Sequence, residues 1–337
     1  MSGAELFRCD GAQPLVLRCW PSGTPVDRVR QIHAVVVPLA KTCDRIAKYR
    51  AVAGSNQTFA IDGSGMIWDL ATWMPGQPLG YDAPLESIGA GAAAIGEAHE
   101  SLRRIASSHG SAPALTERID RLKWLNQHLP SCFGANLGDR VHPSLVAPLE
   151  AARRQLQSNW TAVTPTIATD LRHWAARELP LQYVFRDVHR EHLLFTSGSV
   201  SGIIDYDAIR IDTPATDLAR WATSFAAFST NPGQVIRQVL AGYLHERPLK
   251  DAFNGGSVDI NSSTGIGIGS GFGPINLNAP TSDFRTLVLT IAESSLWISL
   301  ANWVIWLVGQ TRQFPDFQRV AERLSRLIES TDALPKR

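Results

Sequence analysis

Three short apolar runs, with polar residues between them, constrain the fold of this 337-residue chain more than any other segment. The segment extends from Leu181 to Arg220, and its apolar runs cover 181–185, 193–195 and 200–204. Runs of this length that are rich in branched and aromatic residues and are separated by glycine and serine are typical of buried β-strands. The sequence therefore predicts three strands that follow one another closely in the chain.

Carboxylates follow the first and the third of these predicted strands. Asp187 lies two residues beyond the first run, and Asp205 comes directly after the third. His189 and His192 lie in the loop between the first and second runs. Carboxylates at strand ends can hold Mg²⁺ and can accept a proton. We therefore expect the two aspartates to converge on one catalytic site.

This segment resembles the catalytic region of the aminoglycoside-phosphotransferase-like enzymes, relatives of protein kinases that phosphorylate small molecules. Their catalytic loop usually reads HGDxHxxN, and an IDFD or IDFG segment and a DLA segment follow after a hairpin. The matching residues here are Phe185 to His192, Ile204 to Asp207 and Asp217 to Ala219. Three matches in the right order and at the right spacing are fairly specific, whereas a lone Asp-x-His would mean little.

The resemblance implies an α+β, two-lobed protein-kinase-like fold. We expect a small β-rich lobe at 1–74, shortened at its start because the first strand of such a lobe is missing, and a large helical lobe at 75–337. The large lobe would hold the catalytic loop and hairpin at 185–207. A stretch rich in Gly, Ser and Asn at 251–283 is interpreted as a flexible insertion between two helices.

Local patterns predict the other elements. Apolar runs near Leu6 and at 15–18 predict one hairpin, and 57–61 with 66–73 predict another around an Asp-Gly-Ser-Gly turn. Apolar residues at helical spacing predict a helix from Pro25 to about Lys48. The same spacing predicts further helices at 84–105, 115–129, 145–160, 163–178, 216–227, 232–245, 284–310 and 317–328.

The resemblance implies that ATP is bound between the lobes. In the family a loop of small residues covers the ATP phosphates, a basic residue on a nearby strand contacts them, and the main chain of a hinge meets adenine. The residues at these places are Ser2, Gly3, Ala4, Arg18, Ala71, Thr72 and Trp73.

The resemblance also implies a role for each polar residue of the catalytic segment. Asp187 would be the base that orients and deprotonates the acceptor hydroxyl, and Asp205 would hold Mg²⁺ on the ATP phosphates. Asp207 would assist a second metal ion or the acceptor. His189 would form a hydrogen bond within the loop, and Asp217 would brace the loop from beneath.

Three departures from the family pattern keep a second hypothesis open. Phe185 replaces the first histidine of the loop, and Gln31 lies near the glutamate that pairs with the strand cation. His192 replaces the asparagine that usually binds the second metal. Because Mg²⁺ prefers oxygen ligands and imidazole suits Mn²⁺ better, Mn²⁺ is an alternative to Mg²⁺. The second hypothesis is a catalytically weak or inactive nucleotide-binding pseudokinase.

Composition restricts the partners and the compartment. The net charge is +1 and no run of Lys or Arg is present, so we expect no nucleic-acid partner. The four cysteines lack metal-binding spacing, and the N-terminus lacks a secretory pattern, which favours reduced thiols in a cytoplasmic protein. No acidic cluster for a cationic sugar is visible, so the expected partner is a small molecule with a hydroxyl group, of unspecified identity.

One apolar segment, 286–309, is long enough to cross a bilayer. Glu293 and Asn302 lie within it, together with three serines. Because ionisable residues are costly inside a membrane, we interpret the segment as a buried helix and expect no membrane association. A membrane anchor is the weaker alternative.

Overall fold

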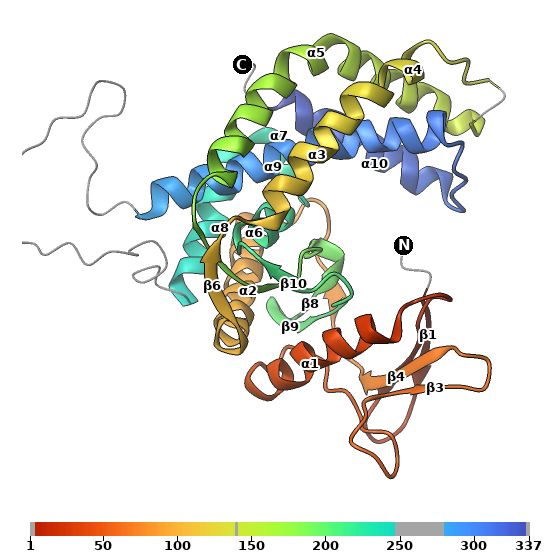
Figure 1. The fold of residues 1–337 in the computed structure, drawn as a ribbon, viewed down its shortest axis with the longest axis vertical. Helices are drawn as coiled ribbons and strands as arrows, with labels where there is room; N and C mark the ends of the chain where they lie inside the picture. The colour runs from red at the N-terminus through yellow and green to blue at the C-terminus, as the bar shows by residue number, and fades with distance from the viewer. Residues whose placement is uncertain (1–3, 139–140, 247–279, 335–337) are drawn as a thin grey trace, which may run out of the picture.

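The computed structural model describes residues 4–138, 141–246 and 280–334. Figure 1 shows two lobes: a small one with β-strands at the lower right, and a larger one whose helices fill the top and the centre. This arrangement confirms the predicted α+β, two-lobed fold class. The predicted loop residues Ser2 and Gly3 lie outside the described residues.

The small lobe is an antiparallel sheet with one long helix. Its strand order is β1-β2-β4-β3, and both predicted hairpins are present. The elements are β1 (Glu5–Cys9), β2 (Leu15–Cys19), α1 (Val26–Thr42), β3 (Phe59–Ile61) and β4 (Ile67–Thr72).

The helix α1 ends six residues before the predicted end at Lys48. Cys43 has an extended backbone with φ −134°. Beyond it the chain runs along β4, because Arg50 N–H donates to Leu70 O at 2.7 Å and Thr72 N–H donates to Lys48 O at 3.1 Å. Backbone pairing with the sheet therefore outweighs the local preference for helix.

The large lobe is mainly helical. Its helices are α2 (Leu85–Ile105), α3 (Pro113–His128), α4 (Pro130–Phe133), α5 (Pro143–Ala175), α6 (Ala215–Ala222), α7 (Ala226–Thr230), α8 (Pro232–Glu246), α9 (Pro280–Val304) and α10 (Phe317–Asp332). The two helices predicted at 145–160 and 163–178 are one continuous helix, α5, in spite of Pro165.

The strands of the large lobe form two separate three-stranded sheets. They are β5 (Gln77–Pro78), β6 (Ser107–Gly110), β7 (Leu179–Val184), β8 (Leu193–Thr196), β9 (Ser199–Ile203) and β10 (Arg210–Asp212). One sheet has the order β10-β7-β6 and the other β5-β8-β9. The three predicted strands exist, but they belong to different sheets: β7 pairs with β6 and β10, and not with the hairpin of β8 and β9.

The helix α9, with a π-helical turn at Ile305–Gly309, is apolar enough to cross a membrane. In its most apolar window, however, 72% of the residues are buried, and it contacts α3, α5, α6 and α10. This burial supports the interpretation as a core helix. Residues 251–279 of the predicted insertion, 251–283, lie outside the described residues, whereas 280–283 begin α9.

Candidate active site

The loop that follows β7 is anchored by Asp217 on α6. The buried carboxylate of Asp217 accepts the backbone N–H of Phe185 at 2.8 Å and of Arg186 at 2.7 Å. It also lies 2.9 Å from Nε2 of His99 on α2. Arg186 has φ 69°, in the left-handed region, so the chain turns sharply just before Asp187. These contacts fix the turn that presents Asp187.

Phe185 fills the place of the family's first loop histidine with an apolar side chain. It is 1% exposed, and its ring lies 6.0 Å from that of His99. Arg186 forms an ion pair with Asp212 and, at 2.5 Å, with Glu117 on α3. The loop is therefore held by packing on one side and by buried charge on the other.

His192 joins the two aspartates of the site. Its Nδ1 lies 2.7 Å from the carbonyl oxygen of Asp187. Because a carbonyl can only accept, Nδ1 carries the proton and the lone pair is on Nε2. Nε2 lies 3.6 Å from Oδ2 of Asp205, which has φ 64° and lies two residues beyond the end of β9. His192 thus links the backbone of Asp187 to the carboxylate of Asp205, and both aspartates line one cavity.

The other loop histidine is neutral. Burial and then the neighbouring His192 and Arg220 lower the pKa of His189 to about 2. Its Nδ1 accepts the N–H of Glu191 at 3.3 Å, so its proton lies on Nε2. As expected from the sequence, His189 forms a hydrogen bond inside the loop.

The donor atoms around this loop suit a divalent cation. The ligand atoms of Asp187, His189 and His192 lie within 4.8 Å of one another. Asp187 Oδ1 already accepts from Arg220 at 2.8 Å, and His189 presents a proton on Nε2. Free lone pairs therefore remain on Oδ2 of Asp187, on Nε2 of His192 and on the Asp205 carboxylate.

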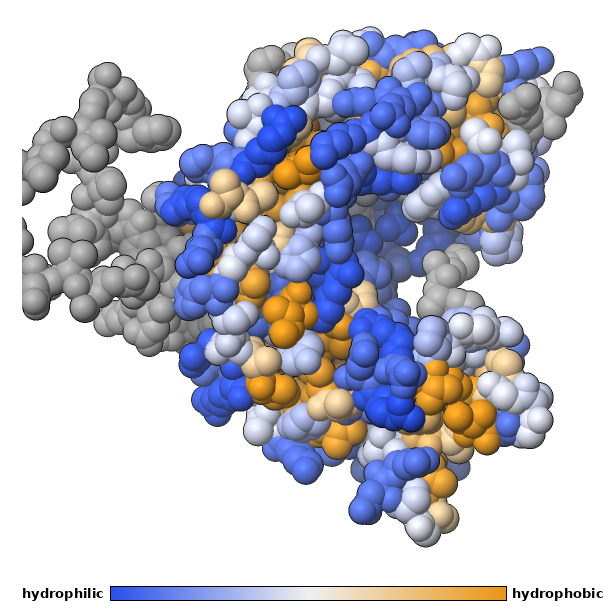
Figure 2. Space-filling view, in the orientation of Figure 1, coloured by the Kyte–Doolittle hydropathy of each residue, from blue (hydrophilic) through white to orange (hydrophobic). Residues whose placement is uncertain are grey.

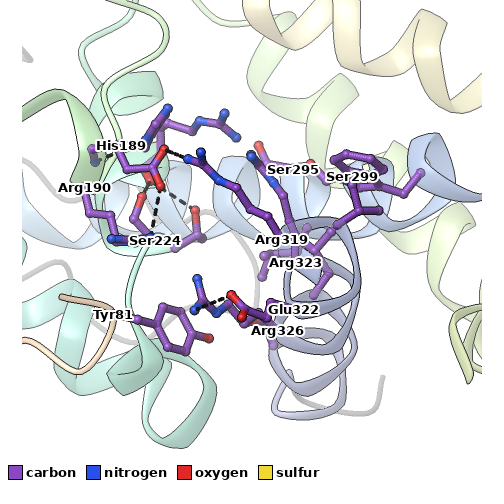
Figure 3. Close-up of a pocket in the computed structure, with 18 of the residues that line it drawn as sticks. Tyr81, His189, Arg190, Ser224, Ser295, Ser299, Arg319, Glu322, Arg323 and Arg326 are labelled. Carbon is purple, nitrogen blue, oxygen red and sulfur yellow. Dashed lines mark hydrogen bonds and ion pairs between the residues drawn. The ribbon is translucent and has the colours of Figure 1, made fainter. Parts of the chain in front are cut away.

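Both aspartates open into a cavity of about 800 Å³ on the large lobe. The loop residues form one wall, and α9 and α10 form the opposite one. Figure 3 shows Arg319 and Arg323 reaching from α10 toward the loop with His189 and Arg190, while Arg326 lies beside Tyr81. In Figure 2 the surface is hollowed between the upper helices and the small lobe, and hydrophilic residues line much of the visible wall.

Arg18 on β2 lies in a network of charges between the lobes. It pairs with Asp69 on β4 at 2.9 Å and with Asp207 at 2.6 Å, and it stacks on the Trp20 ring at 3.7 Å. Burial alone would lower its pKa, but these carboxylates and Tyr49 raise it. Gln31 on α1 is exposed and takes no part, whereas His33 on the same helix reaches the network, with its Nε2 3.2 Å from Asp69.

Asp207 is held by this network and lies outside the cavity lined by Asp187 and Asp205. Burial raises its pKa, and Arg18 opposes that shift. Its backbone N–H donates to Oδ1 of Asp205 at 3.4 Å, so Asp207 lies next to Asp205 while its own carboxylate is engaged by Arg18.

The predicted hinge lies at the end of β4. The N–H of Thr72 donates to Lys48 O and that of Trp73 donates to Pro14 O at 3.0 Å, so neither is a free donor. Ala71 is buried within the sheet, and Trp73 is 40% exposed beneath the guanidinium of Arg8. Ala4 precedes β1.

Sequence reasoning missed several residues of the site. Asp69 could have been found from the sequence, since it lies directly opposite Arg18 in the register of two predicted strands. The cluster of Arg319, Arg323 and Arg326 could also have been found, because their spacing places them on one face of a predicted helix. Arg220 follows the Asp-Leu-Ala segment, but only the structure shows that it binds Asp187.

The fold and the site define the class of protein: a kinase-like fold whose loop after β7 carries an aspartate. Solved structures share this fold. An aminoglycoside phosphotransferase from Alicyclobacillus acidocaldarius aligns with a TM-score of 0.54, at 13% identity, over 97% of this chain and 89% of that one. An amicoumacin kinase in complex with AMP-PNP and Ca²⁺ aligns with a TM-score of 0.55, at 11% identity, over 98% and 86%. At such identities the likeness shows the fold.

The sequence gives the family. The pattern of the phosphotransferase enzyme family matches residues 2–253, which is more than half of the chain. The chain therefore belongs to the phosphotransferase enzyme family. This confirms the predicted resemblance and, at the level of the family, the predicted class of small-molecule phosphotransferase.

A relative in sequence is homoserine kinase from Gluconacetobacter diazotrophicus. It is 36% identical over 118 residues, which are 34% of this chain and 32% of that protein. The chain thus matches about a third of the length of this relative.

Proposed function

We propose that this protein transfers the γ-phosphoryl group of ATP to a hydroxyl group of a small molecule. The observation that carries the proposal is that Asp187 and Asp205 lie on either side of His192 and open into one cavity. A catalytic base and a metal-binding carboxylate side by side are what phosphoryl transfer requires of a protein.

In the proposed reaction, Asp187 orients the acceptor hydroxyl and takes its proton. Arg220 holds Oδ1 of Asp187, which leaves Oδ2 for the hydroxyl. The acceptor oxygen forms a bond to the γ-phosphorus while the bond from that phosphorus to the β–γ bridging oxygen breaks. ADP leaves with that oxygen, and the proton passes from Asp187 to solvent.

Asp205 and His192 would hold the divalent ion. When bound, Mg²⁺ or Mn²⁺ neutralises negative charge on the ATP phosphates. The hydrogen bond from His192 Nδ1 to Asp187 O fixes the ring so that Nε2 faces Asp205. An imidazole ligand suits Mn²⁺ better than Mg²⁺, so we expect Mn²⁺ to support turnover at least as well.

Arg18 would contact the ATP phosphates, with Asp69 and His33 holding it in place. Because the N–H groups of Thr72 and Trp73 are engaged, adenine would meet carbonyl oxygens of the hinge. The free cysteines support a cytoplasmic location. The homoserine kinase match makes hydroxylated amino acids a first group of acceptors to test.

The test is ADP release with ATP, a panel of hydroxyl compounds, and either Mg²⁺ or Mn²⁺. We expect Asp187→Asn to lower kcat by about 10²- to 10⁴-fold, the usual contribution of a general base, with little change in nucleotide affinity. Asp120→Asn on the exposed face of α3 is the matched control and should keep wild-type activity.

Two outcomes would count against the proposal. Equal turnover by wild type and Asp187→Asn would remove Asp187 from the chemistry. Nucleotide binding without turnover in either protein would favour the pseudokinase.

A further inference from the structure

The wall of the cavity opposite Asp187 carries several arginines. Arg319, Arg323 and Arg326 project from α10, and Arg190 and Arg220 come from the loop side. The lining also includes the carboxylates of Glu191, Asp316 and Glu322, so the charge that a ligand meets depends on how these groups pair. The chemistry of the wall therefore bears directly on the acceptor.

Most of these arginines already have carboxylate partners. Arg319 pairs with Glu191 at 2.7 Å, Arg190 pairs with the same carboxylate at 3.1 Å, and Arg326 lies 3.6 Å from Glu322. Arg220 pairs with Asp187 at 2.8 Å. A remaining lining carboxylate, Asp316, accepts the N–H of Arg319 at the start of α10.

Arg323 differs from its neighbours. Among the residues that the structure describes, no carboxylate lies within 4.0 Å of its guanidinium, which is 5.9 Å from the centre of the Trp303 ring. It interacts electrostatically with Glu191 and Asp187, which attract it, and with Arg220 and Arg319, which repel it. A cation without a direct partner, facing the catalytic aspartate, is a binding site for an anion.

A second row of positive charge lies behind α9. Arg118 from α3 donates to Ser295 at 3.0 Å, and Arg121 donates to Asn302 at 2.5 Å. Burial and then the neighbouring Arg186 lower the pKa of Arg118 to about 10, so it still carries its charge at neutral pH. Ser295 and Asn302 both line the cavity, so these two arginines place positive charge behind its α9 wall.

We propose that the acceptor carries an anionic group, a carboxylate or a phosphate, beside its reacting hydroxyl, and that Arg323 binds that group. This inference rests on the proposed function. With the anion on Arg323, the hydroxyl lies toward Asp187, since both residues face the same cavity. The site therefore selects acidic alcohols over neutral or cationic ones.

The test measures binding and ADP release with four small alcohols that differ in charge: glycerate, glycerol 3-phosphate, glycerol and glucosamine. The first two separate a carboxylate from a phosphate. We expect at least one of these anions to bind the wild type tenfold or more tightly than glycerol or glucosamine. Arg323→Gln should weaken that binding by about 10- to 100-fold, as expected for a charge-assisted hydrogen bond.

The control is Arg154→Gln on the exposed face of α5, which removes the same charge far from the cavity lining. It should bind the anions as the wild type does. The inference is overturned if neither anion binds better than glycerol, or if Arg323→Gln and Arg154→Gln behave alike. If the wild type turned over glycerol or glucosamine in preference to the anions, the inference would be overturned and the proposed function would stand. If the wild type showed no ATP-dependent turnover with any compound, the proposed function itself would be contradicted.

Discussion

At the scale of single residues, the catalytic segment owes its geometry to backbone conformations that few side chains favour. Arg186 and Asp205 both have φ near 65–70° in the left-handed region, and each lies beside a proposed functional carboxylate. Such conformations persist only where the surroundings impose them. Here the hydrogen bonds of Asp217 hold the first, and the contact of Asp205 with His192 accompanies the second.

Asp62 shows how a short turn couples to pH. Its carboxylate accepts from Ser64 and Met66 N–H groups and from Nε1 of Trp68 at 2.8 Å. The Ser64 hydroxyl also donates to it at 2.6 Å, and these hydrogen bonds, that of the hydroxyl first, lower its pKa to about 2 from 3.8. Because the folded pKa is depressed, the stability that Asp62 contributes is complete above about pH 4 and is lost as the pH falls toward 2.

We expect Asp62→Asn to be less stable than the wild type at pH 7, with the difference shrinking steadily between pH 4 and pH 2. Thermal unfolding followed by circular dichroism at several pH values measures this. Asp44→Asn, a surface control whose exposed carboxylate pairs only with Lys48 among the described residues, should show no such change. A difference between Asp62→Asn and wild type that stays constant down to pH 2 would contradict the assignment.

At the scale of elements, α2 and α8 approach each other backbone to backbone. A Cβ added at Gly242 of α8 would lie 2.2 Å from the carbonyl oxygen of Gly89 on α2. By contrast, a Cβ at Gly233, in the first turn of the same helix, would meet nothing closer than 3.8 Å. The packing of α2 against α8 therefore requires glycine at position 242 and not at position 233.

We expect Gly242→Ala to lower the free energy of unfolding by about 1–3 kcal/mol, because the two helices must separate. Gly233→Ala should be neutral or stabilising by up to about 1 kcal/mol, since alanine favours helix. Urea unfolding of both variants measures these values. Equal effects at the two positions would show that the close approach does not govern stability.

The hydrophobic pattern of most elements was sufficient to predict them, but not their partners. The strands β1 to β4 and the helices α2, α8 and α10 lie close to where periodicity predicted them. The early end of α1 and the continuity of α5 were not predicted, because local preference was outweighed by pairing with β4 in one case and by packing against α3, α9 and α10 in the other.

At the scale of the whole molecule, the two lobes meet beside the proposed metal residues. Arg28 of α1 donates to the carbonyl oxygens of Asp207 at 2.5 Å and Ile209 at 3.0 Å. The N–H of Ile203, two residues before Asp205, donates to the carbonyl oxygen of Arg45 at 2.8 Å. The position of the small lobe is therefore coupled to the segment that carries Asp205 (Figure 1).

We expect Arg28→Met to raise KM for ATP and to lower kcat/KM by about tenfold, because two hydrogen bonds between the lobes are lost. Arg30→Met on the exposed side of α1 removes the same charge, and among the described residues Arg30 pairs only with Asp27. It should stay within about twofold of the wild type. Steady-state kinetics with varied ATP measure both. A loss of the same size in the two variants would argue against coupling through Arg28.

The amino-acid sequence alone was enough to indicate the loop after β7, the hairpin that follows it and the family resemblance, because these motifs lie within about forty consecutive residues. Folding in three dimensions decided what these residues touch. Arg18 meets Asp207 across 189 positions of sequence, Arg186 meets Glu117 across 69, and Arg319 meets Glu191 across 128. Periodicity and turn chemistry report only on near neighbours, whereas ion pairs and cavity walls depend on how distant elements pack.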